Sequence, residues 1–415
     1  MKNLVILGAG TAGTMMANHL VKKLNKKEWQ ITLVDQFKSH YYQPGFLFIP
    51  FGTYQPEDVK RTIDEFLPKG IQLIREKIDR IDKDTDTVIL ENGRNVKYDI
   101  LIIATGCKIA PEEVPGMKGD TWQKNIFDFY TFEGSCALAK KLETWPGGKL
   151  VVHITEMPIK CPVAPLEFAF LADDYFTKKG MRDKVEISYV TPLSGAFTKE
   201  KCTKALEYLL KDKNIKIVPD FAVEHIEGEK EKMFDYGGEV VDFDLLVTVP
   251  TNMGDECILR SGFGDDLNYV PTDKNTLQSK VKENIFVIGD ATNVPASKAG
   301  SVAHFEAEIL TENILKYIEG KPLNPKFDGH ANCFIETGKG KALLIDFNYD
   351  VEPLKGKFPF AGIGPLNLLE ESAFNHFGKM AFKWVYWNML LPARKIPFVT
   401  STMSRAGKKF DEVEG

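Results

Sequence analysis

The chain has 415 residues, enough for two or three domains with buried cores. Its 53 basic and 58 acidic side chains give a net charge of −5, which argues against a general nucleic-acid-binding protein. Six cysteines without a close CxxC pair indicate neither a disulfide scaffold nor a structural zinc site, and no group of His, Asp and Glu has metal-ligand spacing. No apolar run reaches the ~20 residues that cross a bilayer. A strand predicted at residues 3–7 leaves no room for a cleavable signal peptide.

Short apolar runs alternate with longer segments of helical spacing along most of the chain. Helical spacing occurs in Ala12–Leu24 and Leu166–Lys178. The predicted strands are Leu4–Leu7, Gln30–Val34, Ile100–Ala104, Leu150–Ile154, Val185–Val190, Leu245–Val249 and Ile285–Ile288. This alternation is typical of an α/β fold with largely parallel sheets. Residues 80–99, with the turn Glu91-Asn92-Gly93, predict an antiparallel excursion.

A glycine-rich turn joins the first predicted strand to the first helix. Gly8, Gly10 and Gly13 form a GxGxxG pattern, which lets a pyrophosphate approach the N–H groups at the helix N-terminus. Asp35 ends the second strand, where a carboxylate binds ribose hydroxyls and repels a 2′-phosphate. The alternative is a plain glycine turn. The context of strand, turn and helix favours a dinucleotide-binding domain.

Two further segments indicate which dinucleotide is bound. Tyr98–Gly106 reads YDILIIATG, and Ile285–Asp290 reads IFVIGD. They resemble the ATG and GD motifs of flavoproteins with two dinucleotide-binding domains, such as disulfide reductases and NADH:quinone reductases. The resemblance implies FAD, with Asp290 on the ribityl chain and the backbone near Ile78 beside the adenine. The FAD-binding residues implied in this part of the chain are Gly8, Gly10, Thr11, Ala12, Gly13, Asp35, Gln36, Lys77, Ile78, Ala104, Thr105, Gly106, Gly289 and Asp290.

The second predicted domain lacks the glycine motif that nicotinamide-using relatives carry there. After the strand Leu150–Ile154 comes TEMPIKCP, and no glycine occurs between Gly148 and Gly180. A pyrophosphate cannot approach such a backbone closely, and the two prolines remove N–H donors. We therefore expect no nicotinamide site in this domain.

Two cysteines stand out from the other four. Cys161 lies where the second phosphate loop would be, just before a helix, and Cys333 begins the C-terminal module. A helix N-terminus lowers the pKa of a cysteine, and we expect Lys160 to add to this effect. Glu167 is a candidate for moving protons near Cys161; the alternative is a helix-dipole role in the first turn. The alternative for any single cysteine is a small buried apolar residue.

Over essentially its whole length the chain resembles the sulfide:quinone oxidoreductases. The likeness rests on CPVAPLEFAFLADDYFTKKG around Cys161, on Cys333-Phe334 and on the aromatic C-terminal tail. It implies that Cys161 and Cys333 form a redox-active pair beside the flavin. It also implies that Gln43 and Pro44 pack beside the isoalloxazine ring, and that Lys379 lies against the flavin edge. The resemblance also implies that Phe334 lies beside the quinone. Phe360, Trp384 and Tyr386 are further candidates for the quinone site because of their positions in the C-terminal module.

The remaining cysteines receive lesser roles. Cys136 falls within a predicted helix and out of register with the family's third cysteine, so we expect it to be neither catalytic nor a flavin link. Cys107 follows the ATG turn, where packing beside the flavin and reactivity are both open. Cys202 and Cys257 are expected to be structural, and His304 to be a core histidine.

The tail differs in charge from the rest of the acidic chain. Between Ser372 and Phe410 it has seven basic residues and no acidic one, together with six aromatic residues in 374–387. Phe377, Met380, Trp384, Trp387 and Leu391 follow helical spacing, while Phe382 and Tyr386 face another side. Such a segment suits an anionic membrane surface. The alternative is a helix that only covers the core.

Together these features predict two Rossmann-like dinucleotide-binding domains and a C-terminal amphipathic helical module that associates with a membrane. The expected domains are 1–112 and 271–325 for FAD, 113–270 for the second domain, and 326–415 for the C-terminal module. The expected reaction is sulfide oxidation to polysulfide or sulfur with quinone reduction, in a peripheral membrane protein. Homo-oligomers are compatible with the sequence. The alternatives are a cytochrome c-linked sulfide dehydrogenase subunit, an NADH:quinone reductase and a non-catalytic flavin-binding membrane protein.

Overall fold

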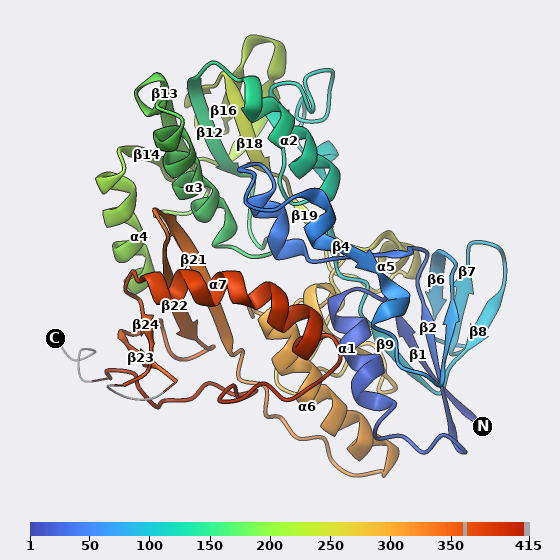
Figure 1. Ribbon diagram of the computed structural model, residues 1–415. Helices are drawn as coiled ribbons and strands as arrows, with labels where there is room; N and C mark the ends of the chain where they lie inside the picture. The colour runs from blue at the N-terminus through green and yellow to red at the C-terminus, as the bar shows by residue number, and fades with distance from the viewer. Residues whose placement is uncertain (360–362, 411–415) are drawn as a thin grey trace.

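Two five-stranded parallel sheets organise the protein. The computed structural model describes residues 1–359 and 363–410 (Figure 1). The first sheet has the order β20-β9-β1-β2-β5 and the second β11-β18-β12-β13-β14. The first comprises β1 (Lys2–Leu7), β2 (Trp29–Val34), β5 (Ile71–Ile74), β9 (Ile100–Ile103) and β20 (Ile285–Val287). The second comprises β11 (Ile126–Phe127), β12 (Gly148–Ile154), β13 (Val185–Val190), β14 (Ile215–Val218) and β18 (Leu245–Val249). All seven expected strands are present, and the α/β fold with two Rossmann-like sheets is confirmed.

Helices connect and cover these sheets, as right-handed crossovers between parallel strands require. They are α1 (Thr11–Leu20), α2 (Phe132–Thr144), α3 (Ala164–Lys178), α4 (Glu200–Asp212), α5 (Glu256–Ser261), α6 (Gly300–Ile318) and α7 (Ala373–Val385). Short 3-10 turns are η1 (Gln43–Phe48), η2 (Pro56–Val59), η3 (Ile63–Glu65), η4 (Pro111–Glu113), η5 (Arg182–Lys184), η6 (Gly228–Lys230) and η7 (Gly289–Ala291). Both sheets consist largely of fully buried apolar residues, as parallel sheets covered by helices on both faces do.

Antiparallel strands branch off the sheets. A meander is formed by β6 (Ile78–Asp82), β7 (Thr87–Leu90) and β8 (Asn95–Lys97), as expected for residues 80–99. A second meander comprises β15 (Val223–Glu227), β16 (Lys232–Asp235) and β17 (Val240–Asp242). Two-stranded pairs are β3 (Ser39–Tyr41) with β4 (Lys60–Thr62), and β10 (Cys107–Ile109) with β19 (Asn252–Gly254).

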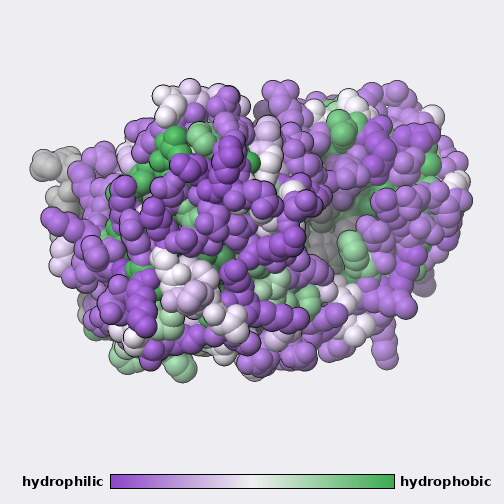
Figure 2. Space-filling model, turned by 90° about the horizontal axis from the view of Figure 1, so that it is seen from above, coloured by the Kyte–Doolittle hydropathy of each residue, from purple (hydrophilic) through white to green (hydrophobic). Residues whose placement is uncertain are grey.

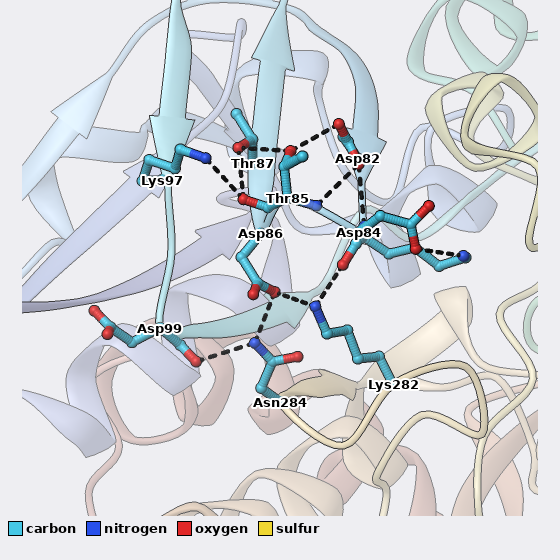
Figure 3. Close-up of polar contacts among 10 residues, drawn as sticks. Asp82, Asp84, Thr85, Asp86, Thr87, Lys97, Asp99, Lys282 and Asn284 are labelled. Carbon is cyan, nitrogen blue, oxygen red and sulfur yellow. Dashed lines mark hydrogen bonds and ion pairs between the residues drawn. The ribbon is translucent and has the colours of Figure 1, made fainter.

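The segment before β20 is tied to the first meander by the polar contacts in Figure 3. Lys282 Nζ donates to Asp86 Oδ1 at 2.8 Å and to the Lys83 carbonyl at 2.5 Å. Asn284 Nδ2 donates to the same Asp86 oxygen at 2.9 Å. Because β20 then pairs with β9, a segment from late in the chain completes the N-terminal sheet.

The C-terminal part is a sheet with a helix rather than a purely helical module. Strands β21 (Ala331–Gly338), β22 (Lys341–Phe347), β23 (Gly356–Phe358) and β24 (Leu366–Leu368) have the order β21-β22-β24-β23. The expectation of a helical module was therefore wrong in part. The Gly338–Gly340 turn closes a β21–β22 hairpin within a region whose glycine- and aromatic-rich composition hid its strands.

Helix α7 packs across β21 and β22 and continues as a π-helical turn, η8 (Tyr386–Leu390) (Figure 1). It begins at Ser372, whose hydroxyl accepts a hydrogen bond from Asn375 N and caps the helix. β21 packs against both α7 and α3. Because β21 also contacts α6, the C-terminal element lies against the helices α3 and α6, which come from the two different Rossmann-like parts.

The outer surface is mostly polar. Figure 2 shows that the upper face is predominantly hydrophilic, with hydrophobic residues visible only in scattered areas. Within the described part of the chain, none of the helices combines the length and apolar character needed to traverse a bilayer.

Candidate active site

The glycine turn between β1 and α1 has the close packing that a dinucleotide loop needs. A Cβ at Gly13 would overlap the Gly8 carbonyl oxygen, so only glycine lets α1 pack against this loop. Gly8 has φ +94°, and a Cβ there would stand 2.5 Å from the Ala104 carbonyl oxygen. At Gly10 no protein atom lies within 4 Å of a Cβ position. That side of the loop is open to a ligand.

Three separated motifs meet at the carboxyl ends of the first sheet. Gly8 follows β1, Ala104 follows β9, and Gly289 follows β20. Gly289 packs against Ala12 of α1, with 3.1 Å between a Cβ at Gly289 and the Ala12 Cβ. The structure therefore places the segments predicted to bind FAD around one loop, although they span about 280 residues of sequence.

The residues present fit a dinucleotide cofactor. The first hydrogen bond of α1 runs from Thr14 N to the Gly10 carbonyl, which leaves the N–H groups of Thr11, Ala12 and Gly13 pointing out of the helix. Thr105 Oγ1, in the ATG turn, is buried and has no protein partner. A buried hydroxyl without a partner is unusual in a folded protein. A bound cofactor would supply both an anion for the helix and a partner for this hydroxyl.

Asp35 holds this loop from the second strand. Its Oδ2 accepts from Ala9 N at 2.6 Å and its Oδ1 accepts from Phe37 N at 2.7 Å. Burial raises the pKa of Asp35, although these two N–H donors favour the charged form. Each oxygen keeps a further lone pair, so the carboxylate can still accept from ribose hydroxyls.

Other predicted cofactor residues lie around the same end of the sheet. Gln36 is exposed directly after Asp35, and Ile78 begins β6. Lys77 pairs with Glu91 at 2.9 Å. Gln43 and Pro44 begin η1, and Gln43 Oε1 accepts from Lys160 Nζ at 3.2 Å. This contact brings the Gln43–Pro44 turn next to the Cys161 loop.

Cys161 sits in a constrained turn before α3. Its φ of +43° is in the left-handed region, a conformation that costs a non-glycine residue of order 1–3 kcal/mol. Cys161 N donates to the Lys298 carbonyl at 2.8 Å, and the Cys161 carbonyl accepts from Ala164 N at 2.9 Å. Tyr130 Oη also donates to this carbonyl at 3.1 Å. These contacts fix the thiol's position where the second domain meets the first.

The expected lowering of the Cys161 pKa was wrong. Burial raises the pKa of Cys161 to about 12, and the nearby Glu167 raises it further, while Lys379 opposes the shift. Lys160 does not supply the expected positive charge, because its ammonium group turns to Gln43 and the Tyr130 ring. The reduced thiol is therefore protonated at neutral pH, and a proton acceptor nearby becomes important.

Cys333 lies on β21, close enough to Cys161 that a charge on one acts on the other. Burial raises the pKa of Cys333, and Cys161 adds to the effect. Both cysteines are free thiols in the described structure, as are the other four. The pair that the sequence separates by 172 residues is therefore brought to one place.

A buried ion pair lies beside the two cysteines. Lys379 Nζ donates to Glu167 Oε1 at 2.8 Å and to Oε2 at 3.2 Å, and their side chains are 10% and 1% exposed. Glu167 Oε1 also accepts from Glu336 N at 2.8 Å, and Lys379 donates to the Phe334 carbonyl at 3.0 Å. The pair thus provides partners for two backbone groups at the edge of β21, the N–H of Glu336 and the carbonyl of Phe334.

The charges of this pair stabilise each other. Burial raises the pKa of Glu167, and Lys379 opposes that rise. Burial by itself would lower the pKa of Lys379, but Glu167 and Cys161 raise it above its ordinary value. Glu167 therefore does more than balance a helix dipole, because it binds α3 to both β21 and α7.

The predicted quinone residues occupy three different settings. Phe334 packs against α7, with its Cζ 2.8 Å from a Cβ position at Gly378. Trp384 is 62% exposed, whereas Tyr386 is 1% exposed. The two tail candidates therefore face opposite sides of the helix. Phe360 lies outside the described residues.

Tyr386 fastens the tail to the dinucleotide loop. Its hydroxyl lies 2.7 Å from Thr11 Oγ1 and 2.7 Å from His40 Nε2. Burial lowers the pKa of His40 to about 4, so its imidazole is neutral at physiological pH. The sequence analysis missed His40, since nothing near it in the sequence indicated a contact with residue 386.

The other singled-out residues show no comparable arrangement. Cys107 Sγ lies 3.9 Å from Asp290 Oδ2, and burial raises the Cys107 pKa to about 12. Cys136 lies in α2 as expected, while Cys202 and Cys257 are fully buried. His304 is also buried, which lowers its pKa to about 4. It is a neutral core histidine.

The fold and this site define a class: an oxidoreductase with the architecture of flavoproteins that have two dinucleotide-binding domains. Residues 2–152 match the pyridine nucleotide-disulphide oxidoreductase family. The mitochondrial sulfide:quinone oxidoreductase of Dictyostelium discoideum is 29% identical over 400 residues, covering 94% of this chain and 86% of that protein. The mouse enzyme of the same name is 26% identical over 394 residues, covering 93% and 86%.

A solved structure has the same fold. The sulfide:quinone oxidoreductase of Aquifex aeolicus superposes with a TM-score of 0.75 at 22% identity, covering 94% of this chain and 92% of that one. Together these findings identify the chain as an oxidoreductase that is homologous to the sulfide:quinone oxidoreductases over most of its length.

Proposed function

We propose that this protein oxidises sulfide and reduces a quinone, with bound FAD as its cofactor and Cys161 and Cys333 as its redox-active pair. One observation supports this proposal above all: the two cysteines lie close to each other and to the buried Glu167–Lys379 ion pair, and the protein also has a glycine loop that fits a dinucleotide. The proposed substrates, sulfide and a quinone, are taken from the names of the relatives that match this chain. FAD, when bound, supplies a carrier that accepts two electrons from a thiol centre and delivers them to a quinone.

Under this proposal, FAD would be held by residues at the carboxyl ends of the first sheet. The N-terminus of α1 would face the pyrophosphate, Asp35 the ribose, and Asp290 the ribityl chain. Thr105 would gain the partner that it lacks within the protein. Lys379 would lie near the flavin through α7.

The cysteines would act on sulfide directly. HS⁻ attacks the Cys161–Cys333 disulfide, forming one S–S bond and breaking another, so that one cysteine becomes a persulfide and the other a thiolate. The net reaction, HS⁻ + quinone + H⁺ → S(0) + quinol, transfers two electrons and consumes one proton. Repeated turnovers would lengthen a polysulfide chain. Because burial disfavours the thiolate, Lys379 is the group that stabilises its charge.

Anaerobic reduction of the bound flavin tests this function. We expect sulfide to bleach the flavin absorbance rapidly, and NADH at micromolar concentration to leave it unchanged. The reason is that the loop after β12 has prolines and no glycine where a nicotinamide dinucleotide would need close backbone contact. Absorbance at the flavin maximum under each reductant is the measurement.

The alternatives give different results in this assay. Rapid bleaching by NADH would identify an NADH:quinone reductase, and no bleaching by either reductant a non-catalytic flavoprotein. Bleaching by sulfide followed by reoxidation with cytochrome c, but not with quinone, would indicate a cytochrome c-linked dehydrogenase subunit. Each of these results contradicts the proposal.

We further propose that the protein attaches to a membrane surface through one face of α7. Phe374, Phe377 and Trp384, the exposed aromatic stripe, are 65%, 70% and 62% exposed. Their spacing of three and seven residues places them on one side of the helix, opposite Lys379 and Tyr386. Amphipathic helices with aromatic side chains on the outer face bind the interface between lipid and water.

Not all of the basic residues in the tail are available to bind an anionic membrane surface. Of the seven basic residues in the tail, Lys379 pairs with Glu167, and Lys408 pairs with the buried Asp346 at 2.9 Å. These two do not face a membrane. Deleting residues 376–415 would also remove these buried contacts, so point substitutions on the stripe make the sharper test.

Substituting the exposed stripe should release the protein from membranes. We expect Phe377→Ser with Trp384→Ser to weaken binding to phosphatidylglycerol-containing vesicles at least about tenfold, because each large aromatic side chain contributes roughly 1.5–3 kcal/mol on leaving water. Vesicle sedimentation measures this. Tyr208→Ser, which removes a 70% exposed aromatic from α4, is the matched control and should have no effect. Equal sedimentation of the double variant and the unaltered protein would refute the attachment model.

A further inference from the structure

A second carboxylate leads from the buried ion pair to the surface. Glu336, on β21, has a side chain that is 2% exposed, and both of its oxygens lie within hydrogen-bond distance of His376 Nδ1, at 3.0 and 2.9 Å. The His376 side chain is 35% exposed. His376 therefore connects a buried acid with solvent.

The same residues adjoin Glu167 and Lys379. His376 and Lys379 are three residues apart on α7, so they lie on the same side of the helix. Glu336 N donates to Glu167 Oε1 at 2.8 Å, which fixes the position of Glu336 against the ion pair. The Glu336 carboxyl also lies within electrostatic reach of Lys379 and Glu167, so these two groups, Glu336 and His376 form one cluster between the cysteine site and the partly exposed His376.

We propose that Glu336 and His376 form a proton relay between solvent and the Glu167–Lys379 pair. The inference rests on the proposed function, because oxidation of HS⁻ by a quinone consumes one proton per turnover. In this relay His376 passes a proton from solvent to the Glu336 carboxylate, and Glu336 passes it to the buried pair. His376 then takes up another proton from water. No residue changes its oxidation state.

The surroundings of Glu336 suit this exchange. Burial raises the pKa of Glu336 to about 7, while the hydrogen bond and charge of His376 and the charge of Lys379 oppose the rise, and Glu167 adds to it. Among the described residues, Tyr54 also lies within electrostatic reach of this carboxyl. A carboxyl that titrates near neutral pH can both accept and release a proton.

His376→Gln in the flavin-loaded enzyme tests the relay. We expect turnover with sulfide and a soluble quinone to fall at least about tenfold. The loss should be smaller than the ~10²–10⁴-fold loss caused by removing a general acid that acts directly on the substrate. Added imidazole should restore the rate. Glu336→Gln should show the same loss without rescue by imidazole, because the inner carboxyl is then missing. His225→Gln, at another partly exposed histidine, is the matched control and should leave turnover unchanged.

Infrared spectroscopy supplies a readout that is independent of turnover. The carbonyl band of protonated Glu336 should titrate near pH 7 and be absent in Glu336→Gln. In His376→Gln its midpoint should move to higher pH, because the group that favours the carboxylate is gone.

The results separate the relay from the proposed function. If sulfide fails to bleach the unaltered enzyme, the proposed function fails. If sulfide bleaches it but His376→Gln keeps full turnover, the relay is wrong and the function stands. A loss of turnover without imidazole rescue and without a shift of the Glu336 band would mean that His376 has only a structural role, and would also overturn the relay.

Discussion

Changing either Cys161 or Cys333 to serine is expected to lower sulfide-dependent quinone reduction at least about 10³-fold, while FAD stays bound. The two thiols lie within electrostatic reach of each other, and the proposed disulfide needs both. Because they would act as one unit, the double variant should be little slower than either single variant. Steady-state turnover is the measurement, with the flavin spectrum as the check on cofactor binding.

A cysteine outside the pair supplies the control for this series. Cys257 is fully buried in α5 of the described structure, and Cys257→Ser should keep most of the activity. Cys202→Ser should also be nearly neutral, but Cys202 lies within electrostatic reach of Cys333, so Cys257 is the cleaner control. If Cys333→Ser kept most of its activity, the paired-cysteine mechanism would have to be abandoned.

Lys379→Met is expected to destabilise the protein by about 3–5 kcal/mol, the usual cost of leaving one partner of a buried ion pair alone. Glu167 would then be buried without its cation, and the free carbonyl of Phe334 would lose its donor. Thermal or denaturant unfolding measures the loss. Activity should fall as well, since Lys379 opposes the rise in the Cys161 pKa.

The loss of stability in Lys379→Met should depend on pH, and the pKa of Glu167 determines how. Burial raises this pKa in the folded state, and removing Lys379 raises it further. A group whose pKa is raised on folding stabilises the protein at low pH, and this contribution is lost as the pH rises. The deficit of Lys379→Met should therefore be smallest below the pKa that Glu167 has in the unaltered protein, which lies above the ordinary value of 4.5, and should grow as the pH rises above it.

A double-mutant cycle separates the ion pair from simple packing. Lys379→Met combined with Glu167→Gln removes both charges, so the double variant should be more stable than Lys379→Met alone. If the two losses were additive and independent of pH, the charges would not interact, and the role assigned to this pair would be wrong.

Much of the α/β framework could be predicted from local sequence patterns. The strands of both parallel sheets are continuous apolar runs such as Ile100–Ile103, because they are buried on both faces. The C-terminal sheet could not be predicted in this way. Its strands β21 and β22 mix charged and aromatic residues, since β21 offers its edge to Glu167 and Lys379 instead of to another strand.

By itself, the sequence singled out the glycine loop that we propose binds the cofactor and the two cysteines that we propose as the redox pair. A dinucleotide loop needs glycine at positions such as Gly8 and Gly13 for local reasons of backbone conformation and close packing, so the pattern is visible in a short stretch of chain. Cys161 was conspicuous because it replaces such a loop in the second domain.

Only the tertiary structure decided the electrostatics of the site. The sequence neighbour Lys160 was expected to act on Cys161, but Lys379, more than 200 residues away, takes that place. Likewise, the contacts of the Tyr386 hydroxyl with Thr11 and His40 had no local signal in the sequence. The physical reason is that burial and charge depend on which side chains packing brings together, and partners far apart in the chain leave no periodic or local signal.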